Sequence, residues 1–214
     1  MRKEVFGMNK SKPKRAPGRP KFADQASPMR DTVLNAASLL FMEFGYEPVS
    51  INQIADKAGV TKASVYYYFS NKAQLFTEAI SEMMKRISVY SSRILKEETD
   101  FKTRLAKLAR VKMSSTHVEF ETMMREALAS LSKEQHEQIR QAEFGIHLAL
   151  AEAFEQALKE KVIESPLSPL LLAHSFAALL MLGNREAELT RETDGEELPK
   201  LIVDLFWNGI GSRA

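Results

Sequence analysis

Apolar residues recur every three to four positions from residue 27 onward, and no stretch alternates between apolar and polar residues as a half-buried strand does. Ser27 and Pro28 are typical of a helix start, as N-cap and first helical residue, and Gly45 ends the apolar repeat. Ser50 and Gln53 form a capping box. These signals predict a first helix up to Gly45 and a short second helix from residue 51.

A third short helix is expected between Thr61, which can cap it, and about Tyr68. Asn71 repeats the capping pattern in front of a long fourth helix. Beyond residue 100, abundant Ala, Leu, Glu and Lys favour five more helices, with breaks near 114–115, 131–132, 165–169 and 193–195. The predicted fold is all-α, with a three-helix head over residues 27–72 and a larger helical body over 73–214.

The second and third predicted helices are joined by the residues KAGVT, in the pattern of a helix-turn-helix, where Gly59 permits the sharp turn. In such a unit the second helix enters the major groove of DNA. Successive residues of a helix are rotated by about 100°. Val65 and Phe69 therefore share the buried face of the third helix, and the tyrosines at 66–68 cannot all join them.

The outward residues of the third helix suit a DNA reader. Ala63 and Tyr67 lie opposite Val65 and can approach base edges or thymine methyl groups, and Ser64 can hydrogen-bond a base edge. Tyr66 and Tyr68 lie on opposite flanks and can reach sugar and phosphate. A half-buried core role for Tyr66 is the alternative, since it is the more frequent use of tyrosine.

Four further residues complete the expected DNA-contacting surface. Lys62 lies at the start of the third helix, within reach of a base or phosphate. Lys72, in the first turn of the fourth helix, can pair with a phosphate beside the free amide groups there. Asn52 faces outward on the second helix, and Ser50 caps the start of that helix.

Charge is distributed unevenly along the chain. Residues 1–21 contain eight Lys or Arg against Glu4, a net charge of +7, so the remainder carries −5 of the total of +2. A basic arm on an acidic body indicates a polyanionic partner at one end, although a solvated tail is the plainer alternative. Residues 1–26 are expected to be disordered. The segment KRAPGRPK (14–21) resembles an AT-hook, in which Arg19 would enter a narrow minor groove.

The segment VSINQIADKAGVTKASVYYYFSNKAQLF (49–76) resembles the N-terminal domain of the TetR family of bacterial transcriptional regulators, and the resemblance covers about residues 28–76. The sequence departs from the family at Tyr68, where histidine is common, and at Ala63, where glycine or proline is common. The resemblance implies a DNA-contacting set that agrees with the helical geometry: Ser50, Asn52, Lys62, Ala63, Ser64, Tyr66, Tyr67, Tyr68 and Lys72.

The same resemblance implies a homodimer formed through the last two long helices and a small-molecule cavity within the body. Residues 168–189 and 196–210 agree with the first expectation, because both are apolar around much of their circumference. Simple burial in the core of one chain is the alternative. Apolar candidates for lining the cavity, which are equally ordinary at helical spacing in a core, are Met84, Met113, Phe120, Met123, Met124, Phe144, Phe154 and Met181.

Two histidine–carboxylate pairs lie four residues apart, His117 with Glu121 and Glu143 with His147. At that helical spacing they can contact a polar group of a ligand, hold a metal, or form ordinary hydrogen-bonded pairs. His117 and His147 are taken as ligand contacts, and no metal or other cofactor is expected.

The amino-acid composition excludes several classes of protein as candidates for this chain. There is no cysteine, which excludes disulfides and thiolate chemistry and suits a reducing cytoplasm. The longest nearly apolar run, residues 169–182, is too short to span a bilayer.

The sequence predicts a cytoplasmic, non-enzymatic transcriptional repressor that a small molecule releases from a palindromic operator in double-stranded DNA. An architectural binder of A·T-rich DNA and a helical metal-dependent enzyme are the alternatives.

Overall fold

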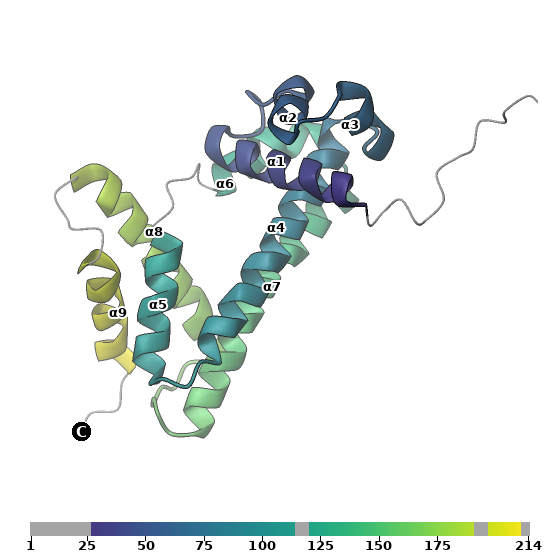
Figure 1. The fold of residues 1–214 in the computed structure, drawn as a ribbon. Helices are drawn as coiled ribbons and strands as arrows, with labels where there is room; N and C mark the ends of the chain where they lie inside the picture. The colour runs from purple at the N-terminus through teal and green to yellow at the C-terminus, as the bar shows by residue number, and fades with distance from the viewer. Residues whose placement is uncertain (1–26, 114–119, 191–196, 211–214) are drawn as a thin grey trace, which may run out of the picture.

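A computed structural model describes residues 27–113, 120–190 and 197–210, with side chains described up to residue 182 and between 197 and 209. Every regular element in these ranges is helical, so the all-α prediction is confirmed. The helices form a head at one end of a long helical pair and a body at the other (Figure 1). None of the helices in these ranges is both long and apolar enough to cross a membrane.

The head consists of three helices whose ends agree with the predicted caps. Ser27 accepts a hydrogen bond from the Arg30 amide, Ser50 forms the complete capping box with Gln53, and Thr61 accepts from the Ser64 amide. The helices are α1 (Pro28–Phe44), α2 (Ile51–Ala58) and α3 (Lys62–Tyr68).

Two long helices connect the head to the rest of the chain and lie side by side along most of their length (Figure 1). They are α4 (Lys72–Leu95) and α7 (Lys133–Lys159). The Gly145 carbonyl oxygen on α7 accepts a hydrogen bond of 2.9 Å from the Ser88 hydroxyl on α4.

The remaining helices match the five predicted beyond residue 100, counting α7 among them. They are α5 (Phe101–Met113), α6 (Phe120–Ala127) with the short 3₁₀ turn η2 (Leu128–Ser130), α8 (Pro169–Thr190) and α9 (Glu197–Ile210). The α5, α8 and α9 helices pack together in the body, whereas α6 lies against α1 of the head (Figure 1).

The hydrophobic core is divided into two clusters that do not coincide with the expected boundary at residues 72 and 73. The first cluster combines α1–α3 with the first half of α4, with α6 and with the start of α7. The second combines the end of α4 and the later part of α7 with α5, α8 and α9. Both long helices therefore cross from one core to the other, and the head has no core of its own.

Three aromatic rings lie at the centre of the first cluster. Phe76 of α4 contacts Phe41 and Tyr46 edge to face, with ring centroids 5.0 and 4.9 Å apart. All three side chains are buried. Met29 and Phe44, at the two ends of α1, are exposed.

The turn after α1 is fixed by a side chain of α6. Gly45 has φ 85° and ψ −178°, a backbone conformation found almost only in glycine. The Glu126 carboxylate lies directly over it and accepts hydrogen bonds from the amides of Tyr46, at 2.9 Å, and Glu47, at 3.4 Å. A Cβ atom on residue 45 would lie 2.6 Å from Glu126 Oε2.

We expect Gly45→Ala to lower the free energy of unfolding by about 2–3 kcal/mol, because backbone strain and the clash with Glu126 add. Gly59→Ala is the matched control. Gly59 also has a positive φ of 66°, but no atom lies within 4 Å of the added Cβ, so its cost is about 1 kcal/mol. Urea unfolding measures both, and Gly45→Ala should cost less in a Glu126→Ala background. Equal costs at the two glycines would contradict the proposed clash.

Candidate nucleic-acid interface and ligand site

The α3 helix presents the faces that the helical geometry predicts. Val65 and Phe69 are fully buried, whereas Tyr66 and Tyr67 are 47% and 52% exposed. Tyr66 is not among the residues that pack against either core cluster, so the structure gives its core alternative no support. Two adjacent phenol rings are thus exposed at the surface of the head.

The start of α3 is open to solvent and rigidly capped. Lys62 and Ala63 are exposed. The Ser64 hydroxyl lies 2.9 Å from the Thr61 hydroxyl, which also accepts the Ser64 amide at 3.1 Å. These bonds satisfy one of the free amide donors of the first turn and hold the Ser64 side chain in place.

Tyr68 has a structural contact that the sequence did not reveal. Its ring is half-buried against the first core cluster, and its hydroxyl accepts a hydrogen bond of 3.0 Å from Ser27, the N-cap of α1. It also meets the Tyr67 ring edge to face at a centroid distance of 5.0 Å. Tyr68 thus ties the end of α3 to the beginning of α1 and supports Tyr67 from the side.

The α2 helix leads into α3 through the expected turn. Gly59 adopts the left-handed conformation, and the Val60 amide closes the turn with a 3.0 Å bond to the Ala55 carbonyl. Ser50 is occupied as a helix cap, with its hydroxyl 2.8 Å from Gln53 Oε1. Asn52 is exposed on α2.

Lys72 connects the start of α4 to the α1–α2 turn. Its ammonium donates to the Glu47 carbonyl at 3.1 Å and lies 4.3 Å from the centre of the Tyr46 ring. Burial lowers the pKa of Lys72, and the nearby carboxylates of Glu47 and Glu126 oppose this effect. To contact a phosphate the ammonium has to share or exchange these partners. Arg19, the candidate of the basic arm, lies outside the described residues.

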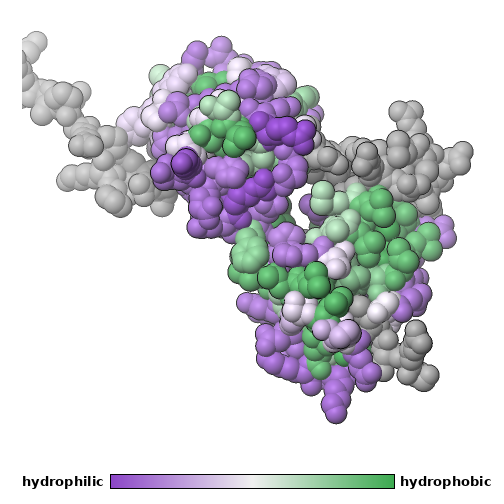
Figure 2. All heavy atoms as spheres, turned by 180° about the vertical axis from the view of Figure 1, so that it is seen from behind, coloured by the Kyte–Doolittle hydropathy of each residue, from purple (hydrophilic) through white to green (hydrophobic). Residues whose placement is uncertain are grey.

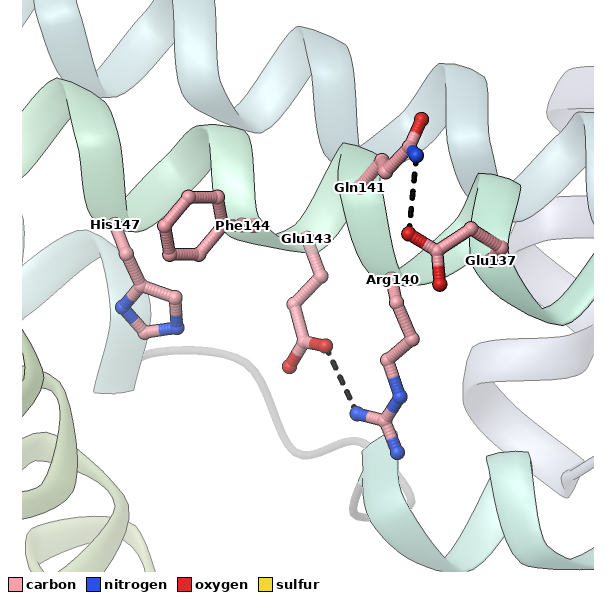
Figure 3. A pocket seen from close by; sticks show the side chains of 6 residues that line it. All are labelled: Glu137, Arg140, Gln141, Glu143, Phe144 and His147. Carbon is pink, nitrogen blue, oxygen red and sulfur yellow. Dashed lines mark hydrogen bonds and ion pairs between the residues drawn. The ribbon is translucent and has the colours of Figure 1, made fainter.

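The body contains an open hollow of about 390 Å³ along α7 (Figure 3). Of the predicted ligand contacts it includes Phe144 and His147, and it also includes Glu143 from the predicted histidine–carboxylate pair. Its full lining is Glu137, Arg140, Gln141, Glu143, Phe144 and His147.

Arg140 is the residue of this hollow that the sequence analysis missed. Its guanidinium binds both carboxylate oxygens of Glu121 on α6, at 2.7 and 3.0 Å, and Glu143 at 2.9 Å. The hydrogen bonds to Glu121, followed by those to Glu143, raise the pKa of Arg140. Glu121 and Glu143, one carboxylate from each predicted histidine–carboxylate pair, are thus both bound by this arginine. Its position three residues before Glu143 was the available signal.

His147, which lines the hollow, contacts a second histidine on α8. The His147 ring meets the ring of His174 on α8 edge to face, with centroids 4.7 Å apart. Burial first, and then the charges of His174 and of Lys112 on α5, lower the pKa of His147. Its Nδ1 atom is buried and has no hydrogen-bond partner in the described part of the chain. Neither Lys112 nor His174 was predicted to belong to a site.

The other residues predicted to line a ligand cavity are not part of the hollow's lining. Met84, Met123 and Met124 are buried in the first core cluster, and Phe154 is buried in the second. Phe120 and Met113 are partly buried. Met181 is exposed on α8, and His117 lies outside the described residues.

No group of three or more potential metal ligands occurs among the residues that the structure describes. The metal-dependent alternative therefore finds no support there.

Residues 33–79, which include α2, α3 and the start of α4, match the family described as bacterial regulatory proteins, tetR family. The chain carries a TetR-family helix-turn-helix domain.

Curated relatives are similar over the same region. The chain is 41% identical over 59 residues to the transposon Tn10 TetC protein of Escherichia coli, covering 28% of this chain and 30% of that protein. It is 31% identical over 88 residues to the HTH-type transcriptional repressor BdcR of Escherichia coli (strain K12), covering 41% and 42%. The chain thus spans about a third of the length of the curated relatives it matches. These relatives include transcriptional regulators.

Solved structures extend the similarity of fold beyond the TetR-family domain. The reduced form of Escherichia coli NemR matches with a TM-score of 0.73 at 18% identity, covering 87% of this chain and 99% of NemR. FadR of Bacillus subtilis in complex with stearoyl-CoA matches with a TM-score of 0.64 at 18% identity, covering 84% and 98%. At this identity the likeness establishes the fold of the body.

We expect Tyr68→Phe to lower the free energy of unfolding by about 0.5–1.5 kcal/mol, because it removes the hydroxyl that accepts the hydrogen bond from Ser27. Tyr66→Phe on the same helix is the control and should leave stability unchanged, since the Tyr66 side chain is exposed. Urea unfolding compares the variants. Equal stability of Tyr68→Phe and the unmodified chain would show that the Ser27 contact contributes nothing.

Proposed function

We propose that the chain is a dimeric, sequence-specific transcriptional repressor that leaves a palindromic operator when a small molecule binds its body. The observation that carries this proposal is the outer face of α3 within the family-matched domain, where Tyr66, Tyr67, Lys62 and Ala63 are all exposed. A recognition helix reads bases mainly from its N-terminal residues, and those residues of α3 are free of the protein core.

The two-fold symmetry of such a repressor requires an interface between two chains, and the body offers an apolar surface for it. Hydrophobic atoms gather on the side of the body where α8 and α9 lie, while the head is mostly hydrophilic (Figure 2). Large exposed apolar patches on soluble proteins mark interaction surfaces. The described residues of this patch, which we call the α8–α9 patch, are Leu171, Met181, Leu182, Leu201 and Leu205.

Pairing two copies through the α8–α9 patch would bury these leucines and present two heads. Dimeric helix-turn-helix proteins place their recognition helices about one turn of DNA apart, about 34–36 Å. An operator with inverted half-sites follows from that symmetry.

The α6 helix supports a response to ligand, because it contacts both the hollow and the head. At its start Glu121 binds Arg140, which lines the hollow. Near its end Glu126 binds the amides of the α1–α2 turn, beside Lys72. A ligand that shifts Arg140 would move α6 and so change the angle of the head. Such a ligand weakens DNA binding to the extent that it prefers the shifted conformation.

The DNA-reading role is tested on operators selected from random duplexes with the full chain. We expect the selected sequences to be palindromic, and Tyr67→Ala to lower affinity for them by tenfold or more in a gel-shift assay, since one lost base contact costs about 1–3 kcal/mol. Lys72→Ala should also weaken binding. Tyr90→Ala on α4, an exposed tyrosine outside the head, is the control.

Deletion of residues 1–21 should only weaken binding to the selected operators, through loss of phosphate contacts. If this deletion abolished all DNA binding while Tyr67→Ala had no effect, the architectural alternative would replace the proposal.

The dimer is tested by charging its proposed surface. Leu201 and Leu205 lie one helical turn apart on α9 and are 51% and 60% exposed. We expect the double change Leu201→Glu and Leu205→Glu to give a monomer in size-exclusion chromatography with light scattering, because buried unpaired carboxylates oppose association. Val89→Glu on α4, 71% exposed and outside the patch, should leave the dimer intact. A double variant that is still dimeric would place the interface elsewhere.

A further inference from the structure

Ser27 makes two contacts in the structure, of which its place in the sequence indicated only one. Its hydroxyl oxygen accepts a hydrogen bond of 3.2 Å from the Arg30 amide, as an N-cap does. The same hydroxyl donates its proton to the phenol oxygen of Tyr68, 3.0 Å away. Tyr68 is the last residue of α3. The cap of the first helix is therefore also a directional partner of the proposed recognition helix.

The direction of this hydrogen bond decides what the Tyr68 hydroxyl can still do. A phenol hydroxyl has one proton to donate and lone pairs that accept. Since Tyr68 accepts from Ser27, its own proton remains available, and the described part of the chain supplies no acceptor for it. A hydroxyl that accepts one hydrogen bond is polarised into a stronger donor. Ser27 thus leaves the partly buried Tyr68 side chain with a prepared, unused donor.

This donor lies beside the outer face of α3. The Tyr68 ring contacts the Tyr67 ring edge to face, with centroids 5.0 Å apart, and Tyr67 is exposed. When a recognition helix lies in the major groove, the sugar–phosphate backbones run along its flanks. A duplex read by Tyr67 would therefore bring a phosphate close to Tyr68.

The cation in the first turn of α1 is already paired. The Arg30 guanidinium binds the Glu78 carboxylate of α4 and lies 5.4 Å from the centre of the Phe69 ring. A phosphate at the junction of α1 and α3 would meet the phenol rather than a free guanidinium. Uncharged side-chain donors, tyrosine included, are ordinary phosphate contacts, and they fix the register of a protein on the duplex.

We propose that Ser27 is a positioning residue of the DNA interface, which holds the Tyr68 hydroxyl so that its proton is donated to an operator phosphate. This inference rests on the proposed repressor function and adds to it a residue that the sequence indicated only as a helix cap. Ser27 acts through Tyr68, by occupying the acceptor side of the phenol oxygen, and does not itself contact DNA.

Ser27→Asp separates the cap from the positioning contact. Aspartate is as good an N-cap as serine and suits the positive end of a helix, but its carboxylate cannot donate a hydrogen bond. The Tyr68 hydroxyl would donate to that carboxylate and lose its free proton. We expect Ser27→Asp to unfold at the same temperature as the unmodified chain, but to bind the selected operator about tenfold more weakly in a gel-shift assay, as Tyr68→Phe should.

Ser27→Asn is the conservative variant that should rescue binding. Its amide oxygen can cap α1 while its amide nitrogen donates to Tyr68, so we expect it to recover most of the affinity that Ser27→Asp loses. The repulsion between the new aspartate and DNA is measured separately, in the Tyr68→Phe background at the same ionic strength. There the phenol proton is already absent, so Ser27→Asp should cost much less than it does in the unmodified chain.

Three results would overturn the role of Ser27. They are additive losses for Ser27→Asp and Tyr68→Phe, equal losses for Ser27→Asp and Ser27→Asn, and an unchanged operator affinity for Tyr68→Phe. In the last case the Ser27–Tyr68 hydrogen bond would serve stability alone.

The same assay distinguishes this inference from the function on which it rests. Operator binding that Tyr67→Ala abolishes, but that neither Ser27→Asp nor Tyr68→Phe weakens, would support the repressor and overturn the positioning role. Phosphate contacts do not depend on base sequence. A chain that selects no operator, yet binds any duplex with the expected pattern of losses at Ser27 and Tyr68, would support the positioning role and overturn the specific repressor.

Discussion

Phe76 of α4 packs edge to face on Phe41 and Tyr46 in a core to which the head and the body both contribute. Met123 and Met124 of α6 and Ile139 of α7 complete this core. Protein interiors are close-packed and do not deform gradually, so the position of α1 depends on that of α6 and α7. The orientation of α3, which is fixed to α1 by Val65, Phe69 and the Ser27–Tyr68 hydrogen bond, is therefore set by packing within the body.

Polar contacts around this shared core link α6 to the head at one end and to α7 at the other. The Glu126 carboxylate accepts hydrogen bonds from two backbone amides of the turn after α1. The Lys72 ammonium of α4 lies over the ring of Tyr46, which belongs to the same turn. At the opposite end of α6, Glu121 is held by Arg140. A helix of eight residues thus joins the margin of the open hollow to the base of the head by charge-assisted hydrogen bonds, which are stronger than neutral ones.

Interactions between near neighbours in the chain were predictable from the sequence. Ser27, Ser50, Thr61 and Asn71 cap the helices for which their side chains suit them, because a cap needs only residues two or three positions away. The outward turn of Tyr66 and Tyr67 followed from helical geometry and the burial of Val65. The tie between Tyr68 and Ser27 spans 41 residues, and no local pattern indicates it. Arg140 likewise reaches across 19 residues to Glu121.

By itself, the sequence determined the helices, their caps, the outward face of α3 and the family of its helix-turn-helix, since these depend on residue type and short-range spacing. Only the tertiary structure decided that the head shares its core with α6 and α7. It also decided which polar residues converge: Glu126 on the α1–α2 turn, Arg140 between Glu121 and Glu143, and His147 beside His174. Periodicity specifies which face of a helix is buried, but not which helix it is buried against. That choice is made by the packing of the whole chain.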